Sequence, residues 1–243
     1  MTSSYVLTIY TRLFLLFMML PIGIMFANSG IDFGTLSPNR LIDCVTNSIQ
    51  VAFFVVPLSI LLGLSGAMVL CKMNTRYTSG LWWILIAPIM LPGISVGVAT
   101  LVFWKNVGAN AGFFAIIAAQ TTFIASYCML ILFAKLKKIP AELERSAISL
   151  GATPTQVFFY ITLPLLMPAI ASSVVISFLA SIENYGTTIF VKGGYCTFAT
   201  EIGAMTRNPD GYPSIINTVG ISVFCVTGLF AAAYLFLIRR END

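Results

Sequence analysis

The residues best suited to chemistry in this chain form one polar run that follows a long apolar stretch: Glu183, Asn184, Tyr185, Gly186, Thr187 and Thr188. A carboxylate beside aromatic faces suits a cationic amine, which it binds through charge pairing and cation–π contact. We therefore predict a path for such a ligand, lined by Glu183, Asn184, Tyr185, Trp104 and Pro92. The alternative for Glu183 is a structural carboxylate that is hydrogen-bonded to Asn or Ser on a neighbouring helix.

A serine between glycines, in Gly63-Leu64-Ser65-Gly66, has the look of the nucleophile of a rhomboid intramembrane protease. A serine nucleophile needs a base, for which rhomboids use histidine, and this chain contains no histidine. The sequence therefore argues against a protease. We predict instead that Gly63, Ser65, Gly66 and Ala67 are small residues that allow close helix packing.

Five cysteines are scattered singly through the chain, at positions 44, 71, 128, 196 and 225, with no Cys-x-x-Cys pair. Closely spaced cysteine and histidine are the usual zinc ligands, so a metal site is not predicted. We interpret all five as small apolar residues of membrane helices.

The elements that carry these residues must lie in a membrane. Apolar residues make up 58% of the chain and charged residues only 9%, against about 25% charged in a soluble domain. A spanning helix needs about 20 mostly apolar residues. Six segments qualify, which predicts an all-α polytopic membrane protein: 7–27, 45–70, 81–103, 112–134, 169–191 and 214–238.

The orientation follows from the basic residues of the connecting loops, because Lys and Arg are enriched on the cytoplasmic side. With the N-terminus inside, nine Lys and Arg lie in the cytoplasm and four outside, so both termini are predicted to be cytoplasmic. Counted from Ala169, Glu183 is then about 21 Å along the fifth span, nearer the outside. A charge at that depth indicates function. The outer loop that follows, 192–214, is predicted to hold a short helix over 200–207.

The third span is predicted to be broken within Ala87–Gly97, because Pro88 and Pro92 remove backbone donors there. Backbone carbonyls freed in this way must find partners inside the protein or in a wet cavity. The break is therefore a candidate gate in a transport path, and a tolerated kink is the alternative.

A polar loop, 135–168, joins the fourth and fifth spans. Pro140 suits a first helical position, Gly151 suits a left-handed helix end, and Thr153 with Gln156 forms a capping box. Two short helices are predicted, 140–150 and 154–162. The first carries an apolar stripe (Leu143, Ala147, Leu150), which fits either the membrane surface or a groove on a partner.

The order Gly151, nine residues, then Ile161-Thr162-Leu163-Pro164 resembles the signature loop of binding-protein-dependent ABC importer permeases, and Ala147 matches the second alanine of that signature. The resemblance implies the type I importer fold, one permease domain over 1–243 and a bacterial inner-membrane location. It also implies that loop 135–168 couples to an ATPase. The implied coupling residues are Glu142, Glu144, Arg145, Ala147, Gly151, Ile161, Leu163 and Pro164.

The signature departs at one point, where its Glu-Ala is Arg145-Ser146. Either Glu144 supplies the carboxylate or the partner ATPase carries a compensating acid. The chain has no G-x-x-x-x-G-K-[ST] phosphate loop, so ATP and Mg are expected in a cytoplasmic ATPase dimer and this chain is not expected to be an enzyme. The resemblance further implies a second permease subunit, in a heterodimer, and an extracytoplasmic binding protein. The lipid bilayer is a further expected partner, and nucleic acid is not.

Residues 177–194 resemble the spermidine/putrescine permeases, which carry an acidic pair where this chain has Glu183-Asn184 and a Phe-Val-x-Gly exit where it has Phe190 to Gly193. The resemblance implies a polyamine cargo, moved by ATP-driven alternating access. Ferric ion, thiamine and aminoethylphosphonate importers share this subgroup and stay open as alternatives. An ion-coupled secondary transporter is the rival from another class, and it would have no use for loop 135–168.

Overall fold

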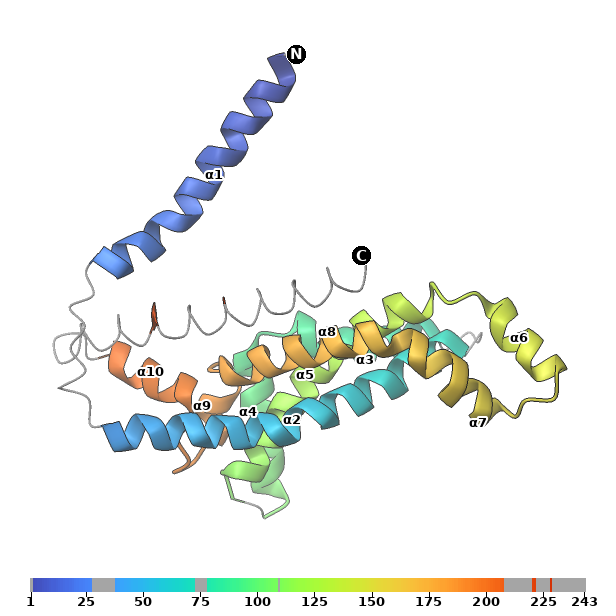
Figure 1. The fold of residues 1–243 in the computed structure, drawn as a ribbon. Coiled ribbons are helices and arrows are strands. Elements are labelled where there is room, and N and C mark those ends of the chain that lie inside the picture. Colours follow the sequence, from blue (N-terminus) through green and yellow to red (C-terminus); the bar gives the residue numbers. More distant parts are fainter. Residues whose placement is uncertain are drawn as a thin grey trace. The chain divides into compact units, whose positions relative to one another are not determined.

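The structure is a computed structural model that describes residues 2–27, 38–72, 78–108, 110–207, 220–221 and 228, and its regular elements there are all helices (Figure 1). The chain divides into two compact units, Met1–Pro38 with Ile202–Asp243, and Asn39–Glu201. In the first unit, α1 (Thr2–Ala27) covers the predicted first span. The predicted sixth span, 214–238, lies almost wholly outside the described residues.

The second unit contains most of the described helices. They are α2 (Pro38–Lys72), α3 (Thr78–Met90), α4 (Gly93–Asn106), α5 (Phe113–Leu136), α6 (Ala141–Ser149), α7 (Pro154–Val157), the π-helical turn η1 (Phe158–Thr162), α8 (Leu163–Ile182), α9 (Thr188–Val191) and the beginning of α10 (Phe198–Thr206), whose residues from Ile202 on belong to the first unit. Three described helical stretches are long and apolar enough to cross a membrane, 40–72, 113–136 and 154–182, and α3 with α4 makes up to four. The all-α fold class is confirmed over the described residues, and the six-span count stays a prediction.

The predicted break in the third span is confirmed. Helices α3 and α4 meet at Leu91-Pro92 and are bent by 103°. Pro92 lacks the N–H that would continue α3, and its ring disfavours the helical conformation at Leu91. The Leu91 N–H donates to Ala87 O at 3.0 Å and closes α3, and the Ser95 N–H donates to Pro92 O at 2.8 Å and opens α4.

Helix α5 lies at the centre of the second unit and packs against α3, α4, α8 and α9. Its buried side chains join two apolar clusters, one with Val51, Val55 and Val191 and one with Ala67 and Leu70. Of the small residues of α2 that were predicted to pack closely, Gly63, Gly66 and Ala67 do so, whereas Ser65 is exposed. A Cβ on Gly63 would lie 2.7 Å from Cys128 Cβ, and the Ser65 hydroxyl donates to Leu62 O within its own helix.

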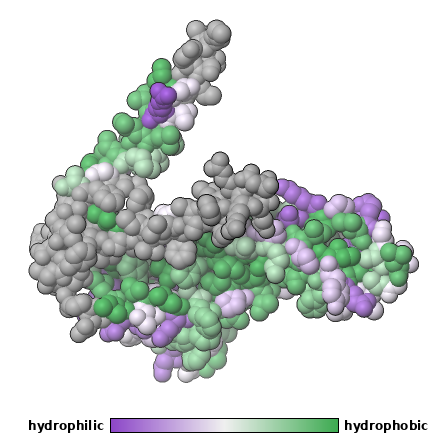
Figure 2. All heavy atoms as spheres, in the orientation of Figure 1, coloured by the Kyte–Doolittle hydropathy of each residue, from purple (hydrophilic) through white to green (hydrophobic). Residues whose placement is uncertain are grey.

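The outer face of α2 is apolar and open, with Phe53 73% and Leu61 64% exposed. Figure 2 shows apolar residues over much of the second unit and a concentration of hydrophilic ones around α6. A contiguous apolar exterior of this kind suits hydrocarbon, which agrees with the predicted membrane location.

The predicted bounds of the fifth span, 169–191, were wrong. The helix begins at Pro154, runs through η1 into α8 and ends at Ile182. The predicted second loop helix, 154–162, is therefore the first part of this long helix. Pro164 lies inside this continuous stretch, where it removes one helical N–H donor, and the π-helical turn η1 comes directly before α8.

The interpretation of all five cysteines as single apolar residues was also wrong. Cys44 and Cys196 form a disulfide, with Cα atoms 5.1 Å apart and a sequence separation of 152 residues. Cys71 and Cys128 are free thiols, and Cys225 lies outside the described residues. The pairing was hidden because cysteines so far apart in the sequence meet only when α2 packs beside the segment after α9.

Candidate functional site

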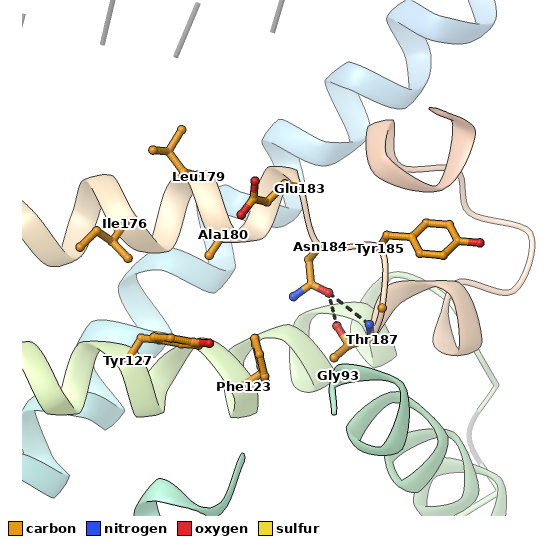
Figure 3. Close-up of a pocket in the computed structure, with 11 residues that line it drawn as sticks. Gly93, Phe123, Tyr127, Ile176, Leu179, Ala180, Glu183, Asn184, Tyr185 and Thr187 are labelled. Atoms are coloured by element: carbon orange, nitrogen blue, oxygen red, sulfur yellow. Dashed lines mark hydrogen bonds between the residues drawn. The ribbon is translucent and has the colours of Figure 1, made fainter. Parts of the chain in front are cut away.

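The polar run that follows α8 forms a tight turn at the end of this helix. Glu183 occupies the C-cap position, and its N–H donates to Leu179 O at 3.1 Å. The Asn184 Oδ1 accepts hydrogen bonds from both the N–H and the hydroxyl of Thr187 (Figure 3). Asn184 therefore holds the turn in place of a helical carbonyl, which is the behaviour expected of Asn in a turn. Helix α9 starts directly after it.

Glycines bring α4 against this turn. A Cβ on Gly97 would lie 2.6 Å from Thr187 O, so only glycine fits there, whereas a Cβ on Gly93 would meet Thr187 Cγ2 at an ordinary 3.6 Å. The N-terminal end of α4, immediately after the break at Pro92, consequently lies against the turn after α8. The two irregular segments that were predicted separately from the sequence form one place in the fold.

A buried hydrogen-bond chain fixes both sides of the turn to α5. The Ser181 hydroxyl donates to Gln120 Oε1 at 2.6 Å, and Gln120 Nε2 donates to Thr188 Oγ1 at 2.8 Å. Gln120 is 1% exposed, so these partners satisfy a side chain that would otherwise be costly to bury. The chain links the end of α8 to the start of α9 and makes the turn between them rigid.

A cavity of about 600 Å³ opens beside the turn, within the range of small-molecule sites. Its lining residues come from α4, α5, α8 and the turn: Gly93, Phe123, Tyr127, Ile176, Leu179, Ala180, Glu183, Asn184, Tyr185, Gly186 and Thr187. Phe123 and Tyr127 stand edge to face, with ring centroids 5.4 Å apart. In Figure 3 these two rings lie on α5 across from the end of α8, and the Tyr185 ring points away from them.

Glu183 is the residue of this lining that carries a carboxylate, and its side chain is exposed. Within the described parts of the chain, no hydrogen bond or ion pair engages that carboxylate. The predicted alternative, a structural carboxylate bonded to Asn or Ser, therefore finds no support among the described residues. A carboxylate beside apolar and aromatic walls can bind a cation that has an apolar body.

The structure brings together most of the residues predicted for the path. Glu183, Asn184 and Tyr185 line the cavity, and Pro92 is the N-cap of α4 beside the lining residue Gly93. Trp104 is elsewhere, packed on the apolar cluster around Val51 and edge to face with Phe103. The aromatic faces of the cavity are Phe123 and Tyr127, which the sequence reasoning missed. Their i, i+4 spacing on α5 was the available signal.

The second predicted site, the segment around α6, has the expected local structure. Gly151 has a φ of +93° and ends α6 in a Schellman motif, in which the Gly151 N–H donates to Ile148 O and the Ala152 N–H to Ala147 O. The predicted capping box is present between Thr153 and Gln156. Pro140, predicted as the first helical residue, is the N-cap instead, and α6 begins one residue later, at Ala141.

The apolar side chains of α6 have no cover among the described residues. Leu143 is 46%, Ile148 52% and Leu150 89% exposed. On α6, Glu142 and Arg145 are exposed and Ala147 is half-buried. On the long helix, Ile161 and Leu163 are half-buried and Pro164 is exposed. The predicted stripe is therefore available to a partner.

Glu144 makes a contact that the sequence did not indicate. Its Oε1 accepts a hydrogen bond from the hydroxyl of Thr162 at 2.7 Å, across 18 residues. Thr162 is buried and lies at the end of η1, directly before α8. This bond ties α6 to the base of the long helix.

Residues 3–238 match the protein family described as "Binding-protein-dependent transport system inner membrane component". The chain is 28% identical over 218 residues to the putrescine transport system permease protein PotI of Escherichia coli (strain K12), with 85% of this chain and 76% of that protein covered. It is 26% identical over 206 residues to the spermidine/putrescine transport system permease protein PotC of Haemophilus influenzae, with 84% and 79% covered. The molybdenum transport system permease protein ModB of Mycobacterium tuberculosis matches at 28% over 158 residues, with 60% of each chain covered.

Solved structures with the same fold include a chain of a bacterial alginate ABC transporter, crystallised in complex with an alginate pentasaccharide-bound periplasmic protein. It has a TM-score of 0.75 and 20% identity, and covers 97% of this chain and 93% of its own. A chain of the MetNI methionine ABC transporter, in an inward facing conformation, has a TM-score of 0.69 and 19% identity, with 84% and 98% covered. These likenesses concern the fold.

Proposed function

The chain belongs to the family of binding-protein-dependent transport system inner membrane components, as a type I ABC importer permease subunit, and we propose that it moves a polyamine such as spermidine or putrescine into the cytoplasm. The observation that carries the proposal is the cavity beside the turn after α8, whose lining includes Glu183 and two aromatic residues of α5, Phe123 and Tyr127.

The chemistry of the cavity favours a cationic cargo. Polyamines combine ammonium groups with a methylene chain, so Glu183 can pair with a charge while Phe123, Ile176 and Leu179 contact the chain. An oxyanion such as molybdate would be repelled by the same carboxylate, although the chain also matches a molybdenum permease. Ferric ion, thiamine and aminoethylphosphonate remain the alternative cargoes for an importer of this kind.

The partners follow from the family and from the open face of α6. We propose that α6 docks in a cleft of a cytoplasmic ABC ATPase dimer, with Leu143, Ile148 and Leu150 as apolar anchors. That dimer uses ATP and Mg. A second permease subunit completes the path, and an extracytoplasmic binding protein delivers the cargo. The permease itself spans the bacterial inner membrane six times as one domain, with both termini in the cytoplasm.

The geometry suggests how ATP-driven motion reaches the cargo. The helical stretch 154–182 begins beside α6 and ends at Glu183, a length of about 43 Å at 1.5 Å per residue. The Glu144–Thr162 hydrogen bond would transmit a movement of α6 to this stretch, and the turn after α8, which packs on α4, would transmit it to α4. We propose that ATP binding moves the turn and the break at Pro92 together, so that the path opens alternately to the two sides.

The experiment that tests the function is uptake into proteoliposomes that contain this chain, its ATPase, the second permease and the binding protein. We expect ATP-dependent, binding-protein-dependent uptake of radiolabelled spermidine or putrescine, and none of molybdate or thiamine. Uptake of molybdate or thiamine instead would overturn the cargo. An ATPase that never co-purifies with the chain would overturn the importer proposal and bring forward an ion-coupled carrier.

The Glu144–Thr162 bond gives a prediction about coupling. Because a hydrogen bond to a charged group contributes about 1.5–3 kcal/mol, Glu144→Ala and Thr162→Val should each lower cargo-stimulated ATP hydrolysis by about tenfold or more. The double variant should lose little more than either single one, since both changes remove the same contact. ATPase assays in proteoliposomes measure this, with Thr155→Val, at an exposed threonine of α7, as the matched control. Additive losses in the double variant would show that the two side chains act separately.

A further inference from the structure

A covalent bond fastens the segment after α9 to the first turns of α2. Cys44 is completely buried, and the Sγ atoms of Cys44 and Cys196 are bonded. Neither the predicted coupling segment nor the cavity uses either residue. The transport proposal therefore leaves this bond unexplained.

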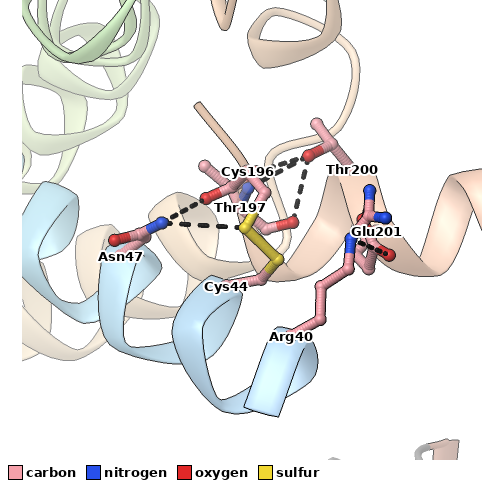
Figure 4. A network of polar contacts seen from close by, with 7 residues as sticks. All are labelled: Arg40, Cys44, Asn47, Cys196, Thr197, Thr200 and Glu201. Atoms are coloured by element: carbon pink, nitrogen blue, oxygen red, sulfur yellow. Dashed lines mark hydrogen bonds and ion pairs between the residues drawn. A yellow bond between two sulfur atoms is a disulfide. The ribbon is translucent and has the colours of Figure 1, made fainter. Parts of the chain in front are cut away.

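Polar contacts surround the disulfide on both sides (Figure 4). The Asn47 Nδ2 donates to Cys196 O at 3.0 Å, and the Phe198 N–H donates to the Ser48 hydroxyl at 2.8 Å. Arg40 Nε lies 3.1 Å from Glu201 Oε1 in an ion pair. Glu201 is 9% exposed, and the guanidinium of Arg40 on α2 compensates the charge of its carboxylate.

Two further contacts extend this set along the same segment. The Tyr195 hydroxyl donates to Gln50 Oε1 at 3.3 Å, and burial raises the pKa of this phenol. The Thr197 N–H and the Thr200 hydroxyl close the start of α10 locally at 3.1 Å. Residues 195–201 thus follow α2 from Arg40 to Gln50, with the disulfide in the middle of the contact.

We infer that Cys44 and Cys196 form a structural clasp on the extracytoplasmic face, which makes residues 192–201 a fixed extension of α2. Persistent disulfides form in oxidising compartments and are rare in the cytosol. The clasp therefore assigns the N-terminal end of α2 and the segment after α9 to the outside. That is the side on which the distribution of Lys and Arg independently puts both segments.

The oxidation is an ordinary thiol–disulfide exchange. The thiolate of one cysteine attacks a disulfide of an extracytoplasmic thiol oxidase, and the second cysteine then displaces the reduced oxidase. The two thiols of this chain lose two protons and two electrons, and the oxidase disulfide gains them as a dithiol. The folded chain presents the two cysteines at a Cα separation of 5.1 Å, within the usual range for a disulfide.

The clasp has a mechanical consequence. The segment it holds begins at Lys192, one residue after α9, and α9 is bonded through Thr188 to Gln120 on α5. The Val191 carbonyl also accepts from the Gly112 N–H, at the start of α5. The outer end of the proposed path is therefore fastened to both α2 and α5. Movement driven from α6 then has to act on the turn at Glu183 and on α4, rather than on the outer segment.

The first test counts thiols in the full chain, expressed in bacterial membranes. The protein is denatured and labelled with a polyethylene-glycol maleimide, with and without prior reduction, and the added mass is read on a gel. We expect two more labelled thiols per chain after reduction. In the double variant Cys44→Ser/Cys196→Ser, reduction should add none. Equal labelling of the unaltered chain with and without reductant would overturn the proposal.

A second test measures the side of the membrane. Gly194 is exposed and a Cβ there meets nothing within 4 Å, so Gly194→Cys is a suitable reporter in a background in which all five native cysteines are replaced by serine. Without those replacements the exposed thiol of Cys71, at the other end of α2, would itself react. A maleimide that cannot cross membranes should label it in spheroplasts, and in sealed inverted vesicles only after detergent is added. Labelling of sealed inverted vesicles would place this segment in the cytoplasm and overturn the assignment.

Thermal unfolding of the purified chain completes the test. Cys44→Ser, Cys196→Ser and the double variant should lower Tm by the same amount, because each removes the same bond. Cys71→Ser, a free thiol at the other end of α2, should leave Tm unchanged. Unequal losses among the three variants, with the unaltered chain insensitive to reductant, would contradict a clasp. This outcome is separable from failure of the transport proposal, which concerns uptake.

Discussion

Gly151→Asp is expected to abolish cargo-stimulated ATP hydrolysis while the membrane domain still folds. Gly151 has a φ of +93°, a conformation that residues with a side chain adopt at a cost of about 1–3 kcal/mol. Relief of that strain would undo the Schellman motif and turn α6 relative to the long helix. A Cβ at Gly151 meets nothing within 4 Å, so the substitution disturbs the local backbone without a clash in the core.

Two control variants separate conformation from charge. Thr155→Asp adds the same charge four residues later, in the first turn of α7, where a carboxylate is favourable. It should leave coupled hydrolysis nearly unchanged. Gly151→Asn should give an intermediate loss, since Asn tolerates positive φ better than other residues do. Co-purification with the ATPase and hydrolysis in proteoliposomes measure these effects. Full activity of Gly151→Asp would show that this segment is not a coupling element.

Glu183→Gln is expected to lower polyamine uptake by about 10- to 100-fold, with ATPase binding retained. The change keeps the shape of the side chain and removes its charge. A charge pair at about 4 Å contributes up to about 4 kcal/mol at an effective dielectric constant of 20, and each 1.4 kcal/mol corresponds to tenfold. The Glu183 carboxylate has no partner among the described residues, so the loss should fall on cargo and leave the fold intact.

Glu183→Asp, which keeps the charge, should retain most uptake. Initial rates with radiolabelled putrescine, and Tm of each variant, measure the two effects separately. Unchanged uptake by Glu183→Gln would remove this carboxylate from the path. A lowered Tm with proportionate loss of uptake would support the structural alternative.

Features that depend on a few neighbouring residues were predictable from the sequence. The Schellman end at Gly151, the capping box at Thr153 and the break at Pro92 are all present. Each is set by one residue's backbone preference or by a side chain that reaches its own turn, so remote packing does not change it. The helical class and the family signature were likewise readable, because hydropathy and spacing are properties of the chain itself.

The end of the long helix at Ile182 was not predictable from the sequence. The apolar run 169–191 predicted one span, yet the helix ends at Ile182. After it, the Asn184 side chain accepts a hydrogen bond from the Thr187 N–H and forms a turn, and α4 packs closely on this turn through Gly97. Hydropathy reports how apolar a stretch is, and it says little about where a buried hydrogen-bond chain such as Ser181–Gln120–Thr188 stops a helix.

Contacts between residues distant in the sequence were decided by the tertiary structure alone. Packing of α5 against α8 puts Phe123 and Tyr127 in the cavity and leaves Trp104 in the core. The return of the chain from α6 to η1 pairs Glu144 with Thr162, and α2 beside the segment after α9 joins Cys44 to Cys196. The sequence thus determined the membrane class, the family and the local hinges. The tertiary structure decided which distant side chains contact each other, because side chains 18 to 152 residues apart carry no local signal of which of them will meet.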